Sequence, residues 1–168
     1  MLKTELKFEN RTQINKMDQQ RHLLYEEYIR DLEMIKCIPF DETYEEQWCI
    51  CQGYLERYHY TWIDIYCDDI IAGFLIIGIT PDCHPDCDYS ICQSFVKREY
   101  RGKGLMTAAI NDFIDAHSLD KYSFVIHDNN AAALRFWRKR FTEIGFHRFP
   151  VRNAGTCRSG ERVYAFAR

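Results

Sequence analysis

The segment 96–107 constrains the fold of this chain more than any other stretch. Its sequence is VKREYRGKGLMT. The alternating run 89–97 predicts a strand that ends here, and apolar residues at helical spacing predict a helix over 105–117. A strand, a glycine turn and a helix therefore follow one another without a linker.

Two glycines in this turn indicate an anion site. Glycine has no Cβ, so the N–H groups around Gly102 and Gly104 can converge on an anion at the positive end of the following helix. Arg101 and Lys103 add full positive charges. A Walker A loop is absent, and Thr107 stands where a dinucleotide fingerprint needs glycine or alanine. The turn predicts a phosphate or pyrophosphate ligand held mainly by main chain, with a plain solvated turn as the alternative.

The rest of the chain predicts a mixed α/β domain over residues 1–168. The order is strand, two helices, three strands, helix, strand, helix, two strands. A proline at position 39 ends the first helix, and Asp41 is the expected N-cap of the second. The expected strands are 2–8, 60–67, 70–79, 89–97, 122–127, 146–151 and 162–167, and the expected helices are 13–36, 41–58, 105–117 and 130–144.

Charge and hydropathy exclude two classes of protein. A formal net charge of -3 is unlike that of a dedicated nucleic-acid binder. The longest apolar run, 70–79, is far shorter than the ~20 residues of a membrane helix. We therefore expect neither direct nucleic-acid binding nor membrane insertion.

The chain contains 8 cysteines. Residues 1–9 show no apolar signal region, which predicts a cytoplasmic protein with reduced thiols. A zinc site built from Cys49, Cys51, Cys83 and Cys87 is the alternative, although these spacings are not the usual C-x₂-C pairs. Free thiols are favoured, and no metal is expected.

Two motifs resemble those of the GNAT superfamily of acyl-CoA-dependent N-acyltransferases. The run RGKGLM at 101–106 resembles the Q/R-x-x-G-x-G/A signature, which binds the pyrophosphate of coenzyme A in that family. The run NAAALRFW at 130–137 is similar to the N-x-x-A-x-x-F-Y helix and is followed by Gly145 and Phe146. Met106 replaces the last small residue of the signature, as in branches that include ribosomal-protein N-terminal acetyltransferases. The resemblance covers about residues 60–150.

The resemblance implies a fold and a co-substrate. The fold is a twisted mixed sheet of about seven strands, splayed in the middle and flanked by about four helices. Acetyl-CoA would be the co-substrate, its pantetheine pairing with backbone near Val96 and its thioester facing an N–H that serves as oxyanion donor. Acceptor-side helices would span about 13–58 and the acetyl-CoA-binding core about 60–150. The implied cofactor-binding residues are Phe95, Val96, Arg101, Gly102, Lys103, Gly104, Leu105, Met106, Thr107, Asn130 and Trp137.

Trp137 departs from the family pattern. Family members frequently have tyrosine here, which donates a proton to the departing thiolate, whereas an indole N–H cannot do so. General-acid catalysis contributes about 10²–10⁴-fold to the rate, and the thiolate of a thiol with a pKa of about 8.5 still leaves without it. The alternative is that Trp137 is a core residue or lines the thioester pocket. The cluster 138–140 is either a solvated helix face or a contact for the adenosine 3′-phosphate.

The acceptor must reach the thioester as a neutral amine, so a base or ordered water must take its proton. His127, at the end of a strand beside the splay, is a candidate base or a partly buried structural histidine, and Asp88 and Tyr89 are further candidates. Carboxylates in the acceptor segments predict an acidic rim suited to a cationic amine, or else an ordinary surface: Glu42, Glu45, Glu46, Asp82, Asp86 and Asp88. A tyrosine-rich patch could wall this pocket or belong to the core: Tyr54, Tyr58, Tyr60 and Trp62.

The leading hypothesis is an acetyl-CoA-dependent N-acetyltransferase that acts on a primary amine by direct attack in a ternary complex. The amine would be a small cationic amine or one on a protein or peptide, and the enzyme a monomer or homodimer. A GNAT-fold module that binds acyl-CoA with little or no turnover is the runner-up. A toxin or antagonist that acetylates a macromolecule is the third hypothesis.

Overall fold

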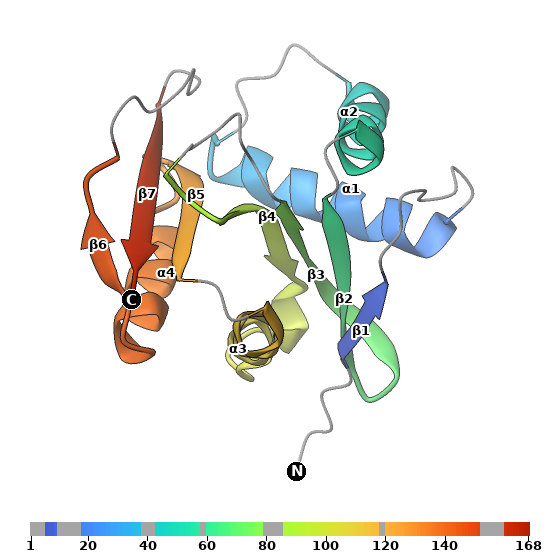
Figure 1. Cartoon of the computed structure of the whole chain (residues 1–168). Coiled ribbons are helices and arrows are strands. Elements are labelled where there is room, and N and C mark those ends of the chain that lie inside the picture. The colour runs from blue at the N-terminus through green and yellow to red at the C-terminus, as the bar shows by residue number, and fades with distance from the viewer. Residues whose placement is uncertain are drawn as a thin grey trace.

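The computed structural model describes residues 6–9, 18–37, 43–57, 60–78, 86–117, 120–151 and 160–168. These residues form one seven-stranded sheet and four α-helices (Figure 1). The strands are β1 (Leu6–Glu9), β2 (Thr61–Cys67), β3 (Ile70–Gly78), β4 (Tyr89–Val96), β5 (Lys121–His127), β6 (His147–Phe149) and β7 (Glu161–Ala167). The helices are α1 (Gln19–Met34), α2 (Tyr44–Arg57), α3 (Leu105–His117) and α4 (Ala131–Glu143), with a 3₁₀ turn at Arg98–Tyr100.

The sheet is mixed and divides between β4 and β5. Its strand order is β1-β2-β3-β4-β5-β7-β6, and β4 and β5 form the parallel pair while the other neighbours are antiparallel. The β4–β5 pairing runs from Tyr89↔Tyr122 to Ile91↔Phe124 and stops there, although β4 continues to Val96. The mixed α/β class, the strand and helix order and the central splay expected from the sequence are confirmed.

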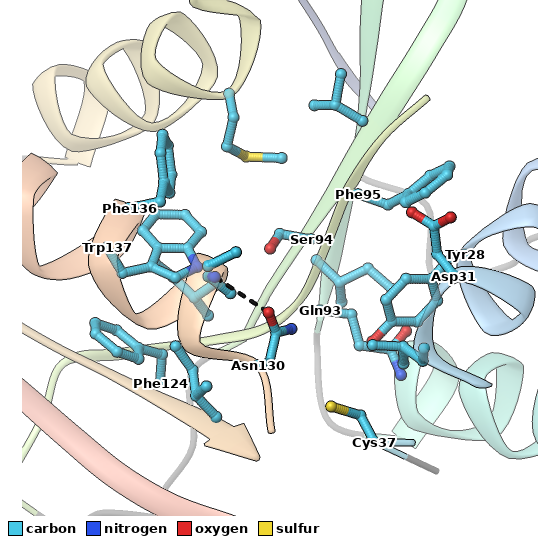
Figure 2. Close-up of a pocket in the computed structure, with 18 of the residues that line it drawn as sticks. Tyr28, Asp31, Cys37, Gln93, Ser94, Phe95, Phe124, Asn130, Phe136 and Trp137 are labelled. Carbon is cyan, nitrogen blue, oxygen red and sulfur yellow. Dashed lines mark hydrogen bonds between the residues drawn. The ribbon is translucent and has the colours of Figure 1, made fainter. Parts of the chain in front are cut away.

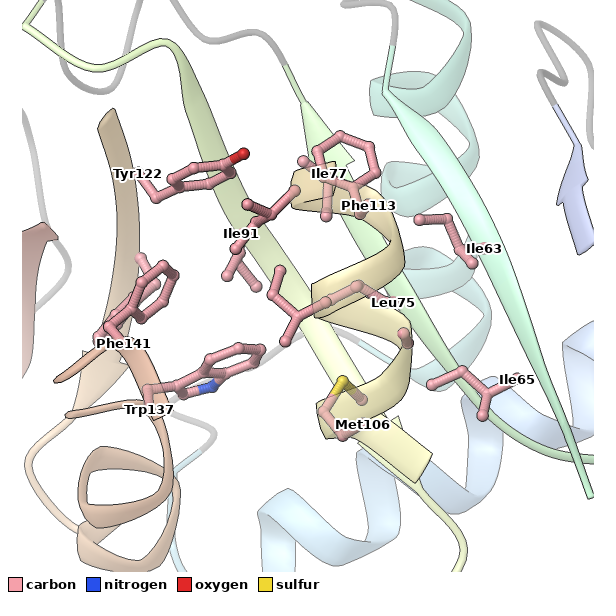
Figure 3. Packing of buried hydrophobic residues seen from close by; sticks show 14 of the residues in the cluster. Ile63, Ile65, Leu75, Ile77, Ile91, Met106, Phe113, Tyr122, Trp137 and Phe141 are labelled. Carbon is pink, nitrogen blue, oxygen red and sulfur yellow. The ribbon is translucent and has the colours of Figure 1, made fainter. Parts of the chain in front are cut away.

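Helices cover both faces of β2 and β3. The side chains of these two strands alternate between the faces, and each face packs into its own apolar cluster. Trp62 and Phe74 point to the face covered by α1 and α2. Ile63 and Leu75 point to the opposite face, where α3 and α4 contribute the facing side chains (Figures 1 and 3). The continuous apolar stretch in β3 thus reflects burial on both sides.

The helix starts differ from those expected. The carboxylate of Asp18 accepts the Arg21 N–H at 3.3 Å and caps α1, so the described helix begins at Gln19, and the expected residues 13–17 lie outside the described residues. At the start of α2, the Glu46 carboxylate accepts the Thr43 N–H at 2.6 Å, and the Glu46 N–H donates to the Thr43 hydroxyl at 3.3 Å. This is a capping box. Position 41, the expected cap, lies outside the described residues.

A buried ion pair attaches α1 to the sheet. Arg21 is 5% exposed and Asp64 of β2 is 1% exposed. The Arg21 guanidinium donates twice to this carboxylate, one bond being Nε–Oδ1 at 3.1 Å, and the Trp62 indole N–H donates to the same Oδ1 at 2.7 Å. Because a buried charge is tolerated only when it is paired and hydrogen-bonded, these contacts fix the position of α1 over β2.

Among the described helices, none combines the length and the apolar character needed to cross a bilayer. A cytoplasmic location stays a prediction from the sequence.

We predict that Asp64→Ala destabilises the fold by about 3 kcal/mol, because it removes the more deeply buried of the two carboxylates that pair with the Arg21 guanidinium and leaves only Asp18. Denaturant unfolding measures the change. The matched control is Glu26→Ala, which removes the i,i+4 partner of the exposed Arg30 and should cost less than about 0.5 kcal/mol. Equal losses in the two variants would contradict the role given to the buried pair.

Candidate functional site

The divergence of β4 and β5 opens a cavity of about 1020 Å³. It lies between the open end of β4, the end of β5, helix α1, the N-terminal turn of α3 and helix α4. Figure 2 shows Phe124, Phe136 and Trp137 on one side of this space, and Tyr28 and Phe95 on the other. This volume is at the upper end of the range for ligand pockets, about 300–1,000 Å³. The cavity thus has room for a cofactor-sized ligand and a second small molecule.

A β-bulge explains why β4 leaves β5. Ile76 of β3 pairs with Gln93, whereas the next residue, Ile77, pairs with Ile91, so Cys92 is an extra residue in β4. A bulge bends its strand and increases its twist. The last pairing with β5 is also at Ile91, so the bend begins where the two strands separate.

The open end of β4 presents backbone groups to the cavity. Lys97 donates its N–H to Ala72 of β3 at 2.8 Å. Backbone groups alternate between the two edges of a strand, so those of Ser94 and Val96 face the gap. The Val96 carbonyl accepts the Arg101 Nε–H at 2.8 Å, and the Val96 N–H points the same way. This edge can pair with an extended ligand.

The glycine turn has the conformation that an anion site requires. Gly102 (φ 77°) and Gly104 (φ 78°) both adopt left-handed backbone, which other residues rarely tolerate. The first intrahelical bond of α3 runs from the Ala108 N–H to the Gly104 carbonyl at 2.9 Å. The N–H groups of 105–107 consequently have no intrahelical acceptor, and these residues line the cavity.

Arg101 lines the cavity and also braces the turn. Its guanidinium pairs with the Asp31 carboxylate of α1, and the Arg98 guanidinium lies 3.5 Å from the same carboxylate. The Arg101 Nε–H donates to the Val96 carbonyl. It thereby connects the glycine turn, β4 and α1. Lys103 lies with its ammonium 4.7 Å from the centre of the Tyr100 ring and is not a lining residue.

Three further residues expected at the site have structural roles there. Met106 is buried in the core facing Trp137, so its side chain packs between α3 and α4 (Figure 3). Trp137 is also buried, with its ring centre 5.0 Å from that of Phe136 and 5.9 Å from that of Phe124, and it lines the cavity as well. Asn130 caps α4 by accepting the Ala133 N–H at 3.1 Å.

His127 lines the cavity, but its hydrogen bonding does not suit a general base. Its Nδ1 accepts the Asn129 N–H at 3.2 Å. A backbone N–H only donates, so the neutral ring carries its proton on Nε2, and its lone pair is already engaged. The Nε2 edge packs on Gly160, where a Cβ would come within 2.7 Å of it.

Asp88 and Tyr89 do not line the cavity. The Asp88 carboxylate accepts the N–H groups of Asp120 at 3.2 Å and Lys121 at 2.9 Å, which fixes the start of β5. The Tyr89 ring packs edge-on against Phe113 at 5.1 Å, and burial, together with Asp88, raises its pKa. Asp88 and Tyr89 therefore have structural roles at the end of the β4–β5 pairing that is remote from the cavity.

The described carboxylates of the expected acidic rim do not line the cavity. Glu45, Glu46, Asp86 and Asp88 are absent from the residues that line the cavity, and positions 42 and 82 lie outside the described residues. Of the tyrosine-rich patch, Tyr60 lines the cavity and Trp62 is core, whereas residue 58 and the side chain at 54 are not described. The basic cluster 138–140 does not line the cavity either.

Sequence reasoning missed Glu161. It begins β7, directly opposite His127 in the β5–β7 register, and it lines the cavity. Burial raises the pKa of the Tyr28 phenol, and Cys51, Cys37 and Glu161 raise it further. No local motif marks this residue, since strand pairing alone brings it here.

The described residues contain no group of three or more histidine, cysteine or carboxylate side chains that could hold a metal ion. The six described cysteines are free thiols, and positions 83 and 157 lie outside the described part.

The family model described as "Acetyltransferase (GNAT) family" matches residues 21–141, which include the glycine turn and most of α4. No curated protein matches the sequence at a significant level.

Solved structures share the fold over almost the whole chain. An acetyltransferase of the GNAT family from Staphylococcus aureus is 12% identical with a TM-score of 0.66, covering 98% of each chain. An acetyl transferase from Salmonella typhimurium that modifies the N-terminal serine of a ribosomal protein is 14% identical, with a TM-score of 0.61 and coverage of 98% and 94%. Diaminobutyrate acetyltransferase from Paenibacillus lautus, in complex with its substrate and coenzyme A, is 13% identical, with a TM-score of 0.61 and coverage of 98% and 96%. At these identities the likeness is one of fold.

We predict that Cys51, which lines the cavity, resists alkylation at pH 8. Burial raises the pKa of its thiol to about 12, so the reactive thiolate is scarce, whereas Cys49 on the same helix is exposed. Mass spectrometry after timed iodoacetamide treatment should find Cys49 modified first, and both modified equally in denaturant. Equal rates in the folded protein would show that the thiol at 51 is accessible.

Proposed function

The chain belongs to the acetyltransferase (GNAT) family, and on that premise we propose that it transfers the acetyl group of acetyl-CoA to a primary amine by direct attack in a ternary complex. The proposal treats residues 1–168 as one cytoplasmic domain, with the acceptor side formed by the first two helices and the acetyl-CoA side by about 60–150. The observation that carries it is the separation of β4 from β5 beside the glycine turn of α3.

The co-substrate side follows from the backbone. The unpaired N–H groups of 105–107 suit the pyrophosphate, because a helix N-terminus attracts negative charge. The open edge at Ser94 and Val96 suits the pantetheine amides, which pair with it as an added strand. Diaminobutyrate acetyltransferase, which has this fold, was solved with coenzyme A bound.

The reaction joins the amine nitrogen to the thioester carbonyl carbon and breaks the C–S bond. A backbone N–H on the open edge of β4 stabilises the oxyanion that forms. Trp137 supplies no proton to the leaving thiolate, so water does. The thiolate of a thiol with a pKa of about 8.5 is a fair leaving group at neutral pH.

The test is product formation. Purified protein with acetyl-CoA and a panel of amines, peptides and aminoacylated tRNA should release coenzyme A together with an acetylated product, both measured by mass spectrometry. Because Trp137 replaces a common proton donor, a binding module is the second candidate. Tight acetyl-CoA binding without product across the panel would favour that module.

We predict that Gly104→Glu lowers acetyl-CoA affinity about tenfold or more, since a carboxylate near the phosphates repels them by about 1–3 kcal/mol. Isothermal titration calorimetry measures the affinity. Gly145→Glu is the matched control, because Gly145 has a similar φ of 86° and equally open surroundings but lies away from the cavity. Unchanged affinity in Gly104→Glu would refute the assignment of the turn.

A further inference from the structure

The bulge in β4 decides which helices Gln93 faces. Side chains of a regular strand alternate between its two faces, so Ile91 and Gln93 would share a face. The bulge at Cys92 breaks this alternation. Ile91 packs into the cluster that α3 and α4 cover, whereas Phe95, two residues after Gln93, packs against α1 and α2. A bulge beside a site re-aims a side chain in this way, so Gln93 lies on the Tyr28 side of the cavity (Figure 2).

Contacts from both of these helices hold the Gln93 amide. Its Nε2 donates to the Tyr25 hydroxyl of α1 at 3.2 Å, and its Oε1 accepts from the Cys51 thiol of α2 at 3.9 Å. Burial raises the pKa of the Tyr25 phenol and of the Cys51 thiol, so both stay protonated at pH 7. All three residues line the cavity. One uncharged polar group from each of three elements thus converges at one place in the cavity wall.

The amide oxygen of Gln93 can accept a second hydrogen bond. An amide oxygen has two lone pairs, and a thiol is a weak donor. Among the described residues, the Cys51 thiol is the one donor to Gln93 Oε1. Gln93 is half-buried, and its side chain borders the cavity. Its oxygen can therefore bind a donor that enters the cavity.

Gln93 lies beside the expected place of the thioester. In the proposed complex, the pyrophosphate binds at 105–107 and the pantetheine runs along the open edge from Val96 towards Ser94. The ladder between β4 and β5 closes this path at Ile91. The acetyl end of the co-substrate consequently comes to lie next to Ser94 and Gln93, on the stretch of β4 before the ladder closes.

Resting on the proposed acetyl transfer, we propose that Gln93 binds the attacking nitrogen of the acceptor amine through its amide oxygen. The amine arrives as an ammonium ion, and water takes one proton before the attack. An N–H of the neutral amine donates to Gln93 Oε1, which leaves the nitrogen lone pair free to attack the thioester carbon. As the C–N bond forms and the C–S bond breaks, water takes a second proton from the nitrogen and supplies one to the thiolate. The amide itself takes no proton.

Tyr25 acts through Gln93. Its hydroxyl accepts the Nε2 hydrogen and so fixes the orientation of the amide. An amide nitrogen in place of the oxygen would donate to the lone pair that has to attack. Tyr25 is therefore a positioning residue, and Gln93 is the residue that touches the substrate.

Gln93→Leu tests the contact, because leucine has a similar volume and no polar side-chain atom. With the full-length protein and saturating acetyl-CoA, kcat/KM should fall about tenfold for every acceptor that the wild type acetylates. The probes are ethylamine, phenylethylamine, diaminobutane and glycinamide, beside the peptides of the panel. The loss should be uniform because the contact is with the nitrogen that all of them share. Acetyl-CoA affinity, measured by isothermal titration calorimetry, should change less than about twofold.

Gln52→Leu is the matched control. Gln52 is a buried glutamine on α2 that does not line the cavity, so the same substitution there should leave kcat/KM unchanged. Gln93→Met, with a longer and more flexible side chain, is the second variant if leucine lowers acetyl-CoA affinity. Unchanged kcat/KM at position 93, or a loss confined to one acceptor, overturns the inference and leaves acetyl transfer standing. Acetyl-CoA binding without product from any acceptor overturns both.

A double-mutant cycle tests the role of Tyr25. Tyr25→Phe keeps the ring and removes the hydroxyl, so kcat/KM should fall about threefold in the wild-type background. In the Gln93→Leu background the same substitution should have no effect, because the hydroxyl acts only through the amide. Equal losses in the two backgrounds would show that Tyr25 does not position Gln93.

Discussion

The site depends on the short pairing between β4 and β5. Their parallel ladder stops after Ile91↔Phe124, where a bulge at Cys92 bends β4. An uninterrupted ladder would bury the backbone groups of Ser94 and Val96 in ordinary sheet bonds. Because it stops, the open edge, the cavity and the N-terminus of α3 adjoin one another.

Arg101 couples the two halves of the cavity. The guanidinium holds the Val96 carbonyl, pairs with Asp31 of α1 and thus joins the glycine turn to the helix that carries Tyr25 and Tyr28. A basic residue that the motif assigns to an anion therefore also fixes the backbone of the turn. In the proposed function, the main-chain N–H groups at the start of α3 hold the anion.

The cavity has fewer carboxylates than the rest of the protein surface. The net charge of -3 comes from carboxylates that cap helices, form ion pairs or face solvent, and few of them line the cavity. Glu46 closes a capping box, and Asp88 fixes the start of β5. The aromatic residues, in contrast, gather around the cavity and in the core beneath it.

The sequence by itself determined the order of the elements, the glycine turn and the resemblance to an acyltransferase family, because these depend on local periodicity, on left-handed glycines and on motifs within a few residues. It could also place Trp137 on a buried helix face. Only the tertiary structure decided that Glu161 lines the cavity, that His127 has its lone pair engaged, and that Asp88 and Tyr89 lie outside. Strand register, the bulge and the divergence of β4 from β5 set these positions, and they arise from pairing between segments far apart in the chain, which no local pattern encodes.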